Sequence, residues 1–200
     1  MPLIDSKILE VLLLGYFLGS FPSGVVFTKI TGSGDIRRAG SGNIGATNVL
    51  RTGNKLLAFL TLMSDIGKGF LAIKIANLID PSLNTILIAA LSCITGHIFP
   101  LWTGFKGGKG VATAIGILLA LSWQIALAVI AIWLIIAVIT RYSSLAALTA
   151  FTTLPFLITI LEARFQFLAL CITIIIWITH KRNINRLFKG KETKINLQKK

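Results

Sequence analysis

Long uninterrupted apolar runs dominate the chain, and short polar stretches separate them. The runs do not alternate between apolar and polar positions, so they favour helices over strands. A helix needs about 20 mainly apolar residues to cross the hydrocarbon core of a membrane. The pattern therefore predicts an all-α integral membrane protein. Its seven expected transmembrane helices lie at about residues 3–29, 56–77, 84–102, 111–121, 124–140, 144–161 and 165–180.

The stretch from Val111 to Ile139 is too long for one ordinary span and short for two full ones. The charges decide between these alternatives. Two short helices with a turn near Ser122 place most of the 20 Lys and Arg residues, including those of the basic C-terminal tail, on one side. One long helix would put that tail on the side opposite the glycine-rich loops, against the positive-inside rule. We therefore expect the N-terminus outside and the C-terminus and glycine-rich loops in the cytoplasm.

Composition agrees with a membrane protein. The chain is 54% hydrophobic and carries a formal net charge of +13. Such a charge is compatible with nucleic-acid binding, but the spans exclude that class, and anionic lipid is the simpler partner. No linker or low-complexity segment divides the sequence, so residues 1–200 are expected to form one domain. No nucleic acid and no obligate protein partner is expected.

The first loop contains "GSGNIG", which fits the glycine pattern of dinucleotide sites. That motif needs a preceding strand and a βαβ unit, and here a charged loop and a membrane span flank it, so we reject the match. If a helix began at Ser41, then Ser41, Gly45, Asn48 and Thr52 would share one face, with Arg51 beside it. The loop is then either an anion-binding face or a flexible basic segment that touches lipid headgroups.

The second loop, "FKGGKG", lies between two apolar stretches. Gly107, Gly108 and Gly110 allow close backbone approach and lead directly into an apolar helix. The N-terminus of that helix offers free N–H groups and the positive end of its dipole, and Lys106 and Lys109 add full charges. This arrangement favours a phosphate site at the membrane surface. The alternative is a plain turn with lysines that extend toward the interface.

The third polar cluster follows the last span and reads "HKRNINRLFKGKE". His180, Asn183 and Arg186 are spaced by three residues and share a helical face. A histidine at the membrane boundary can serve as a general acid or base or bind phosphate, although a lone one is often only an anchor.

Charged residues also occur inside the predicted spans. Asp65 and Lys68 are three apart on one helix and can pair, and His97 lies near the cytoplasmic end of the third span. Charges inside a membrane are functional candidates by default. They keep open an alternative function, a transporter of a phosphorylated anion. Against it, most polar residues gather at one face, and the two halves of the sequence show no internal repeat.

Three stretches together resemble one family: "GSGNIGATNVLR", "FKGGKG" preceded by "GHIFP", and "HKRNINRLFKGKE". The chain resembles the bacterial membrane glycerol-3-phosphate acyltransferases that use acyl phosphate, the PlsY family. The resemblance implies transfer of a fatty acyl group from acyl phosphate to the 1-hydroxyl of glycerol 3-phosphate, which yields lysophosphatidic acid and phosphate. It also implies a bacterial inner-membrane location, with the active site on the cytoplasmic face.

The resemblance and the loop chemistry together define an expected site. The expected catalytic residues are Ser41, Arg51, His180 and Asn183. The expected substrate-binding residues are Asn43, Asn48, Asp65, Lys68, His97, Lys106, Gly107, Gly108, Lys109, Gly110, Arg186 and Glu192. No metal and no cofactor is expected, because the seven acidic residues are dispersed and the cations can neutralise phosphate. The base that deprotonates the hydroxyl stays open between His180 and a phosphate oxygen of the substrate.

Overall fold

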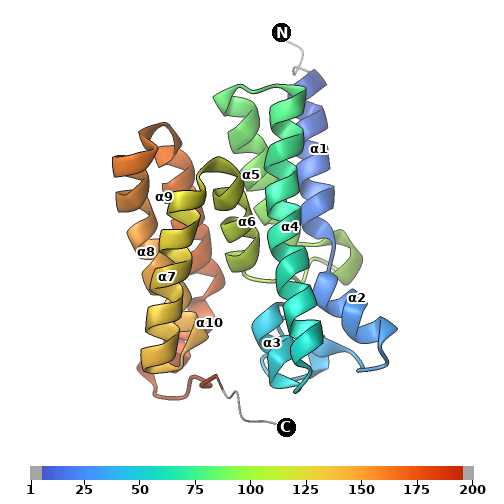
Figure 1. The fold of residues 1–200 in the computed structure, drawn as a ribbon. Coiled ribbons are helices and arrows are strands. Elements are labelled where there is room, and N and C mark those ends of the chain that lie inside the picture. The colour runs from blue at the N-terminus through green and yellow to red at the C-terminus, as the bar shows by residue number, and fades with distance from the viewer. Residues whose placement is uncertain (1–5, 196–200) are drawn as a thin grey trace.

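The computed structural model describes residues 6–195, and this part of the chain is a bundle of helices without strands (Figure 1). Its α-helices are α1 (Ser6–Ser20), α2 (Ser23–Ile30), α3 (Ala46–Arg51), α4 (Lys55–Ile79), α5 (Leu83–Ile98), α6 (Val111–Leu121), α7 (Trp123–Thr140), α8 (Ser143–Leu161), α9 (Gln166–Thr179) and α10 (Lys181–Phe188). Its 3-10 helices are η1 (Ile36–Arg38), η2 (Leu101–Thr103) and η3 (Ala163–Phe165). The predicted all-helical class is confirmed. The start of the predicted first span at residue 3 and the end of the basic tail at Lys200 lie outside the described residues.

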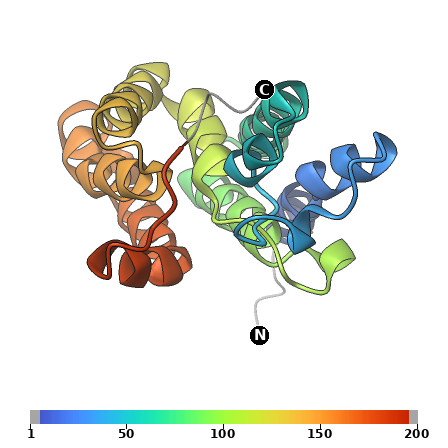
Figure 2. The same ribbon diagram turned by 90° about the horizontal axis from the view of Figure 1, so that it is seen from below.

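The helices form two neighbouring groups, α1 to α6 and α7 to α10 (Figures 1 and 2). The small helices α2, α3 and α10 and the tail 189–195 all lie at one end of the bundle, which we call the polar end. Helix α1 begins at the opposite end. The three polar clusters of the sequence therefore meet between the two groups.

The lengths of the helices limit how many of them cross a membrane. Within residues 6–195, four helices are long and apolar enough to span, and up to six spans exist if each bent helix pair counts as one. Helix α6 has 11 residues and rises only about 16 Å, roughly half of a hydrocarbon core. Side chains such as Val138, Ile139 and Phe156 are exposed on the outer surface, as lipid-facing residues are. The fold is thus that of an integral membrane protein.

The segment predicted as the first span, residues 3–29, is not one continuous helix, because the chain breaks after α1. Helices α1 and α2 meet at an angle of 40° around Phe21 and Pro22. Proline has no N–H to continue a helix, and it occupies the position that caps α2. The carbonyl oxygen of Phe21 lies in this break and accepts hydrogen bonds from the Ser23 amide at 3.1 Å and from Lys68 Nζ at 3.0 Å. The break thus supplies a polar group to the interior.

Helices α4 and α6 pack at close range through glycines. A Cβ on Gly116 would lie 2.8 Å from the carbonyl carbon of Ile66, and a Cβ on Gly69 would lie 3.1 Å from that of Thr113. Small residues allow backbones to approach in this way within membranes. The short helix α6 is consequently fixed against the middle of α4, and its N-terminus lies inside the bundle.

Candidate active site

The first loop does not form the polar helical face that a helix beginning at Ser41 would give. Helix α3 begins only at Ala46, after Gly45 in its capping position, and Ser41 lies in the irregular loop before it. Glycines with positive φ at positions 40 and 42 flank Ser41, and such backbone conformations are incompatible with a helix. The condition for one helical face that carries both Ser41 and Arg51, a helix beginning at Ser41, is therefore not met.

Asn48 holds this loop in shape. Its side chain is buried, and its Oδ1 atom accepts a hydrogen bond from the Ser41 amide at 2.9 Å. Its Nδ2 atom donates to three loop carbonyls, those of Ile36 (3.2 Å), Ala39 (2.9 Å) and Asn43 (2.8 Å). The side-chain amide is fully used within the loop, so Asn48 positions Ser41 and Asn43.

The glycine loop is bonded to the end of α5 on one side and to α9 on the other. The amides of Gly107 and Gly108 donate to the carbonyls of Ile98 and His97, each at 3.0 Å. On the far side, Thr179 Oγ1 donates to the Lys109 carbonyl at 3.1 Å. The loop therefore bridges the two groups of helices.

Gly110 has φ +88° and caps α6. The first hydrogen bond of α6 is donated by the Ala114 amide to the Gly110 carbonyl. The amides of Val111 and Ala112, which precede Ala114, therefore have no partner within the helix. Gly108, in contrast, has no positive φ, and its reason for being glycine is different, as shown below.

His180 and Lys109 lie at the junction of the two groups. The Nδ1 atom of His180 is 2.8 Å from the Ile176 carbonyl. Because a carbonyl only accepts, Nδ1 carries the proton and Nε2 keeps its lone pair. Burial lowers the pKa of Lys109 to about 8. At neutral pH Lys109 is thus mostly charged.

Glu192 is buried and organises the third cluster. It accepts hydrogen bonds from Ser144 Oγ at 2.8 Å, from Asn183 Nδ2 at 2.6 Å and from Arg186 Nε at 2.6 Å. Burial alone would raise the pKa of Glu192, but these bonds outweigh it and lower the pKa below its usual value. The carboxylate therefore stays charged and fixes Asn183.

Arg51 faces Glu192 from the other group of helices. One of its terminal nitrogens, Nη2, donates to the Thr193 carbonyl at 3.3 Å. Its Nε atom is buried and has no hydrogen-bond partner within residues 6–195. Burial lowers the pKa of Arg51, but an arginine stays charged at neutral pH. Arg51 thus offers an unused donor at the site.

A first cavity, of about 570 Å³, lies between α4, α6, α7 and α8, and we call it the apolar cavity. Its polar end is lined by Ser41, Arg51, Lys109, His180, Asn183 and Glu192. Its other end is lined by apolar side chains, among them Phe59, Leu62, Met63, Ile115, Trp133 and Leu134. Since Phe59, Met63 and Leu134 are also exposed on the lipid-facing surface, this end opens toward the membrane.

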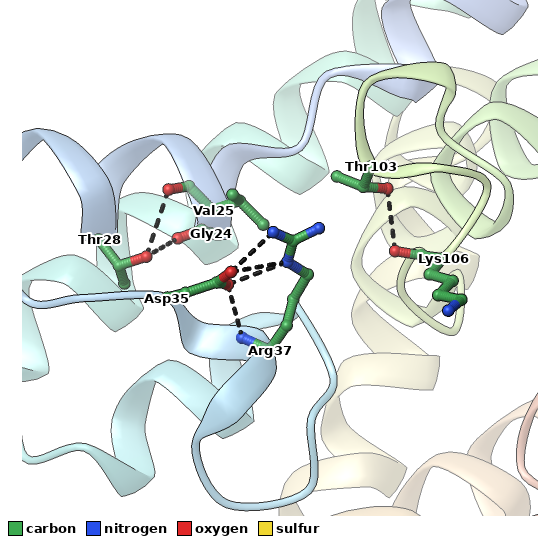
Figure 3. A network of polar contacts seen from close by, with 7 residues as sticks. All are labelled: Gly24, Val25, Thr28, Asp35, Arg37, Thr103 and Lys106. Atoms are coloured by element: carbon green, nitrogen blue, oxygen red, sulfur yellow. Dashed lines mark hydrogen bonds and ion pairs between the residues drawn. The ribbon is translucent and has the colours of Figure 1, made fainter.

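A second cavity, of about 930 Å³, opens at the polar end, and we call it the basic cavity. Seven cationic residues line it: Arg37, Arg38, Lys106, Lys109, Lys181, Arg182 and Arg186. The acidic residue in its lining, Asp35, is paired with Arg37 at 2.7 Å, and Figure 3 shows this pair, with Lys106 on a neighbouring loop. The hydrogen bonds from Arg37 lower the pKa of Asp35 to about 2. The two cavities share Ser41, Asn43, Lys109 and Asn183 as lining residues, so they meet there.

The structure brings most of the expected site residues together, but not all in the same way. Lys106, Gly107 and Gly108 line only the basic cavity. Asp65 and His97 line the apolar cavity from within the bundle, whereas Lys68 lines neither cavity.

Comparison with known proteins identifies the family. A family model described as glycerol-3-phosphate acyltransferase matches residues 9–190. A glycerol-3-phosphate acyltransferase of Mesorhizobium japonicum is 51% identical over 92% of this chain and 94% of its own. One of Nitrobacter winogradskyi is 50% identical over 90% and 92%. The chain belongs to the glycerol-3-phosphate acyltransferase family. The resemblance noted from the three motifs is confirmed, and the protein is an acyltransferase.

Solved structures of this family have the same fold. A crystal structure of PlsY, an integral membrane glycerol 3-phosphate acyltransferase, in its glycerol 3-phosphate form matches with a TM-score of 0.89 and 37% identity over 96% of both chains. The lysophosphatidic acid form matches with a TM-score of 0.87 and 36% identity, over 94% of this chain and 95% of that one. The match covers both groups of helices.

Sequence reasoning missed several residues that shape the site. Ser144 bonds Glu192, Thr179 bonds the Lys109 carbonyl, and Ser23 bonds Asp65 at 2.7 Å. Each is a small hydroxyl residue at the end of an apolar helix, a signal too common to stand out. The apolar lining, such as Trp133, carries no sequence signal, since it resembles any lipid-facing residue.

Proposed function

We propose that the protein transfers an acyl group from acyl phosphate to the 1-hydroxyl of glycerol 3-phosphate, the first step of phospholipid synthesis. The observation that carries this proposal is the junction of the two cavities. An apolar, membrane-facing cavity meets a water-facing basic cavity at Ser41, Asn43, Lys109 and Asn183. One lipid substrate and one soluble anion can meet there.

The donor fits the apolar cavity. Its acyl chain lies among Phe59, Met63 and Trp133, of which Phe59 and Met63 are exposed on the outer surface. Its phosphate lies at the polar end, where Lys109 and the free amides at the start of α6 supply positive charge. Such preorganised donors stabilise the charge that develops on the carbonyl oxygen and on the leaving phosphate.

Glycerol 3-phosphate enters through the basic cavity, whose cations attract its phosphate. Arg51 holds that phosphate at the junction, because its Nε donor is buried and unused. Ser41 and Asn183 orient the 1-hydroxyl toward the acyl carbon. Asn43 lies with them on the shared wall of the two cavities.

The chemistry balances without an acyl-enzyme. The 1-hydroxyl oxygen forms a bond to the acyl carbon, the bond between that carbon and the phosphate oxygen breaks, and phosphate leaves. A phosphate oxygen of the substrate, with a second pKa of about 6, is a competent base at neutral pH, whereas His180 is buried and has its Nδ1 atom bonded to the Ile176 carbonyl. We therefore assign proton acceptance to a substrate phosphate and hydrogen-bonding at Nε2 to His180. Positioning and charge neutralisation carry the rest of the catalysis.

For the topology, we propose that α6 is a seventh, partial crossing, and that α1 with α2 and α9 with α10 are two bent spans. The N-terminus then lies outside, and the polar end faces the cytoplasm of a bacterial inner membrane. The charge distribution supports this orientation, since the cations of the basic cavity obey the positive-inside rule. The whole chain, 1–200, acts as one domain.

A two-donor assay tests the function. Purified protein in lipid is given labelled glycerol 3-phosphate with either acyl phosphate or acyl-CoA. We expect lysophosphatidic acid and an equal amount of phosphate with acyl phosphate alone, and we expect activity to persist in chelator. Within residues 6–195, no cluster of three or more His, Cys, Asp or Glu residues could hold a metal ion. Product only with acyl-CoA would refute the donor, and uptake of glycerol 3-phosphate into vesicles without acylation would favour the transporter alternative.

A further inference from the structure

A buried polar cluster lies behind the glycine loop and does not take part in the chemistry described above. It consists of Asp65 and Lys68 of α4, His97 of α5, and the Ser23 hydroxyl at the start of α2. All four side chains are nearly inaccessible to solvent. Isolated charges at such depth are costly, so their retention calls for a specific purpose.

The cluster is internally bonded at its α4 end. Asp65 Oδ1 pairs with Lys68 Nζ at 2.7 Å and accepts a hydrogen bond from Ser23 Oγ at 2.7 Å. Lys68 also donates at 3.0 Å to the Phe21 carbonyl in the break between α1 and α2, and this carbonyl also accepts from the Ser23 amide at 3.1 Å. Because these contacts occupy the ammonium group, and because Lys68 lines neither cavity, Lys68 is not arranged to bind substrate directly.

His97 connects this pair to the glycine loop. Its Nδ1 atom lies 3.6 Å from Asp65 Oδ1 and has no hydrogen-bond partner in the described part of the chain. Its Nε2 side lies against Gly108. A Cβ built on Gly108 would be 2.7 Å from His97 Cε1, 2.9 Å from Cδ2 and closer still to Nε2. The imidazole is thus a wall against which the Gly108 backbone packs.

Gly107 has a different neighbour. A Cβ there would collide with the backbone carbonyls of His97 and Ile98 and with the ring of Pro100. Gly108 is therefore required by the His97 side chain, and Gly107 by two backbone carbonyls and the Pro100 ring. Gly107→Ala and Gly108→Ala therefore form a matched pair of variants. Removing the His97 side chain should relieve the clash at position 108 but not the clashes at position 107.

We propose that Asp65, Lys68 and His97 are positioning residues: the ion pair orients the His97 ring, and the ring sets the position of Gly108. Lys109 follows Gly108 directly, and its carbonyl is held from the other side by Thr179. A shift of the Gly108 backbone therefore moves Lys109 and the α6 N-terminus away from the donor phosphate. The proposal rests on the proposed function of that loop as the acyl-phosphate site.

A double-mutant cycle tests the proposal. In Gly108→Ala the new methyl group clashes with the imidazole, and we expect the KM for acyl phosphate to rise about tenfold or more, since a displacement of about 1 Å costs up to ~100-fold in rate. In His97→Ala the ring is absent, so adding Gly108→Ala should cost nothing further, and the double variant should match His97→Ala. Gly107→Ala clashes with backbone, so His97→Ala should not rescue it.

Other outcomes would overturn the proposal. If His97 bound substrate by itself, the effects of His97→Ala and Gly108→Ala would multiply. If the loss were only one of folding, Gly108→Ala would lower the melting temperature and the amount of active enzyme, while the KM for acyl phosphate of the folded enzyme would stay unchanged. As a milder probe, Ser23→Ala removes one bond to Asp65 and should raise the KM for acyl phosphate while the KM for glycerol 3-phosphate stays unchanged. Equal changes in both constants would contradict a role confined to the glycine loop.

Failure of this cycle is separable from failure of the proposed function. The wild-type enzyme measured alongside the variants reports the function by itself. An active wild type with multiplicative variant effects rejects the positioning network and leaves the acyltransferase assignment intact.

Discussion

The charge of Lys109 should set the alkaline limit of donor use. Burial lowers the pKa of Lys109 from its usual value near 10.5 to about 8, which corresponds to about 3 kcal/mol against the charged form. The ammonium is present below this pKa and is lost as pH rises through it. Since kcat/KM reports the free enzyme, kcat/KM for acyl phosphate should fall about tenfold between pH 7 and pH 9.

The assay follows lysophosphatidic acid formed from labelled glycerol 3-phosphate, with initial rates at subsaturating acyl phosphate. Both phosphates of the substrates complete their second ionisation near pH 6, so their titration lies outside the window. Saturating donor should protect the ammonium, because a bound phosphate raises its pKa, and the decline in kcat should shift to higher pH.

Lys109→Arg is the decisive control. A guanidinium keeps its charge throughout this range, so the variant should lose the alkaline decline even if its different geometry lowers its rate. Lys109→Met should be slow and equally flat. A decline near pH 8 that persists unchanged in Lys109→Arg would show that another group titrates and would refute the assignment.

Three further predictions each concern one residue and its contacts. Asn48→Ala removes four hydrogen bonds and should cost about 2 kcal/mol or more in thermal unfolding while raising the KM for glycerol 3-phosphate; rescue by Asn48→Asp, which cannot donate, would contradict this. Glu192→Gln should lower the melting temperature and move the Lys109 midpoint to lower pH, because Glu192 raises that pKa; an unchanged midpoint would argue against their coupling. Gly116→Ala should destabilise by about 1–3 kcal/mol, whereas Gly67→Ala, whose Cβ would meet nothing within 4 Å, should not; equal melting temperatures would exclude close α4–α6 packing.

Much of the fold was accessible from the sequence, because apolar length and charge asymmetry are local signals. The turn at Ser122 separates α6 from α7 as the charge argument required, and α8 and α9 match the predicted segments within about two residues. The first and third polar clusters lie together at one end of the bundle. Each of these conclusions needed only the order of residues along the chain.

The rest depended on contacts between segments distant in sequence. Nothing local shows that Glu192 will bond Ser144, or that Gly108 is glycine because of His97 rather than because of its own φ. The break at Pro22 was missed since proline can also begin a helix without ending the apolar run before it. The roles of these residues follow from their contact partners, which the neighbouring sequence does not show.

The shortness of α6 explains how the two substrates can react without extracting the lipid. Because α6 packs on Ile66 and Gly69 near the middle of α4, its N-terminus and Lys109 lie inside the bundle, at the apolar cavity. A full-length span would place that positive end at the outer surface, and the donor would have to leave the membrane at about 0.8 kcal/mol per exposed CH₂ group. With the short helix, the acyl chain stays among apolar side chains, and the soluble phosphate travels inward through the basic cavity. The lowered pKa of Lys109 is the cost of this arrangement, since a charge brought to the lipid substrate must itself be partly desolvated.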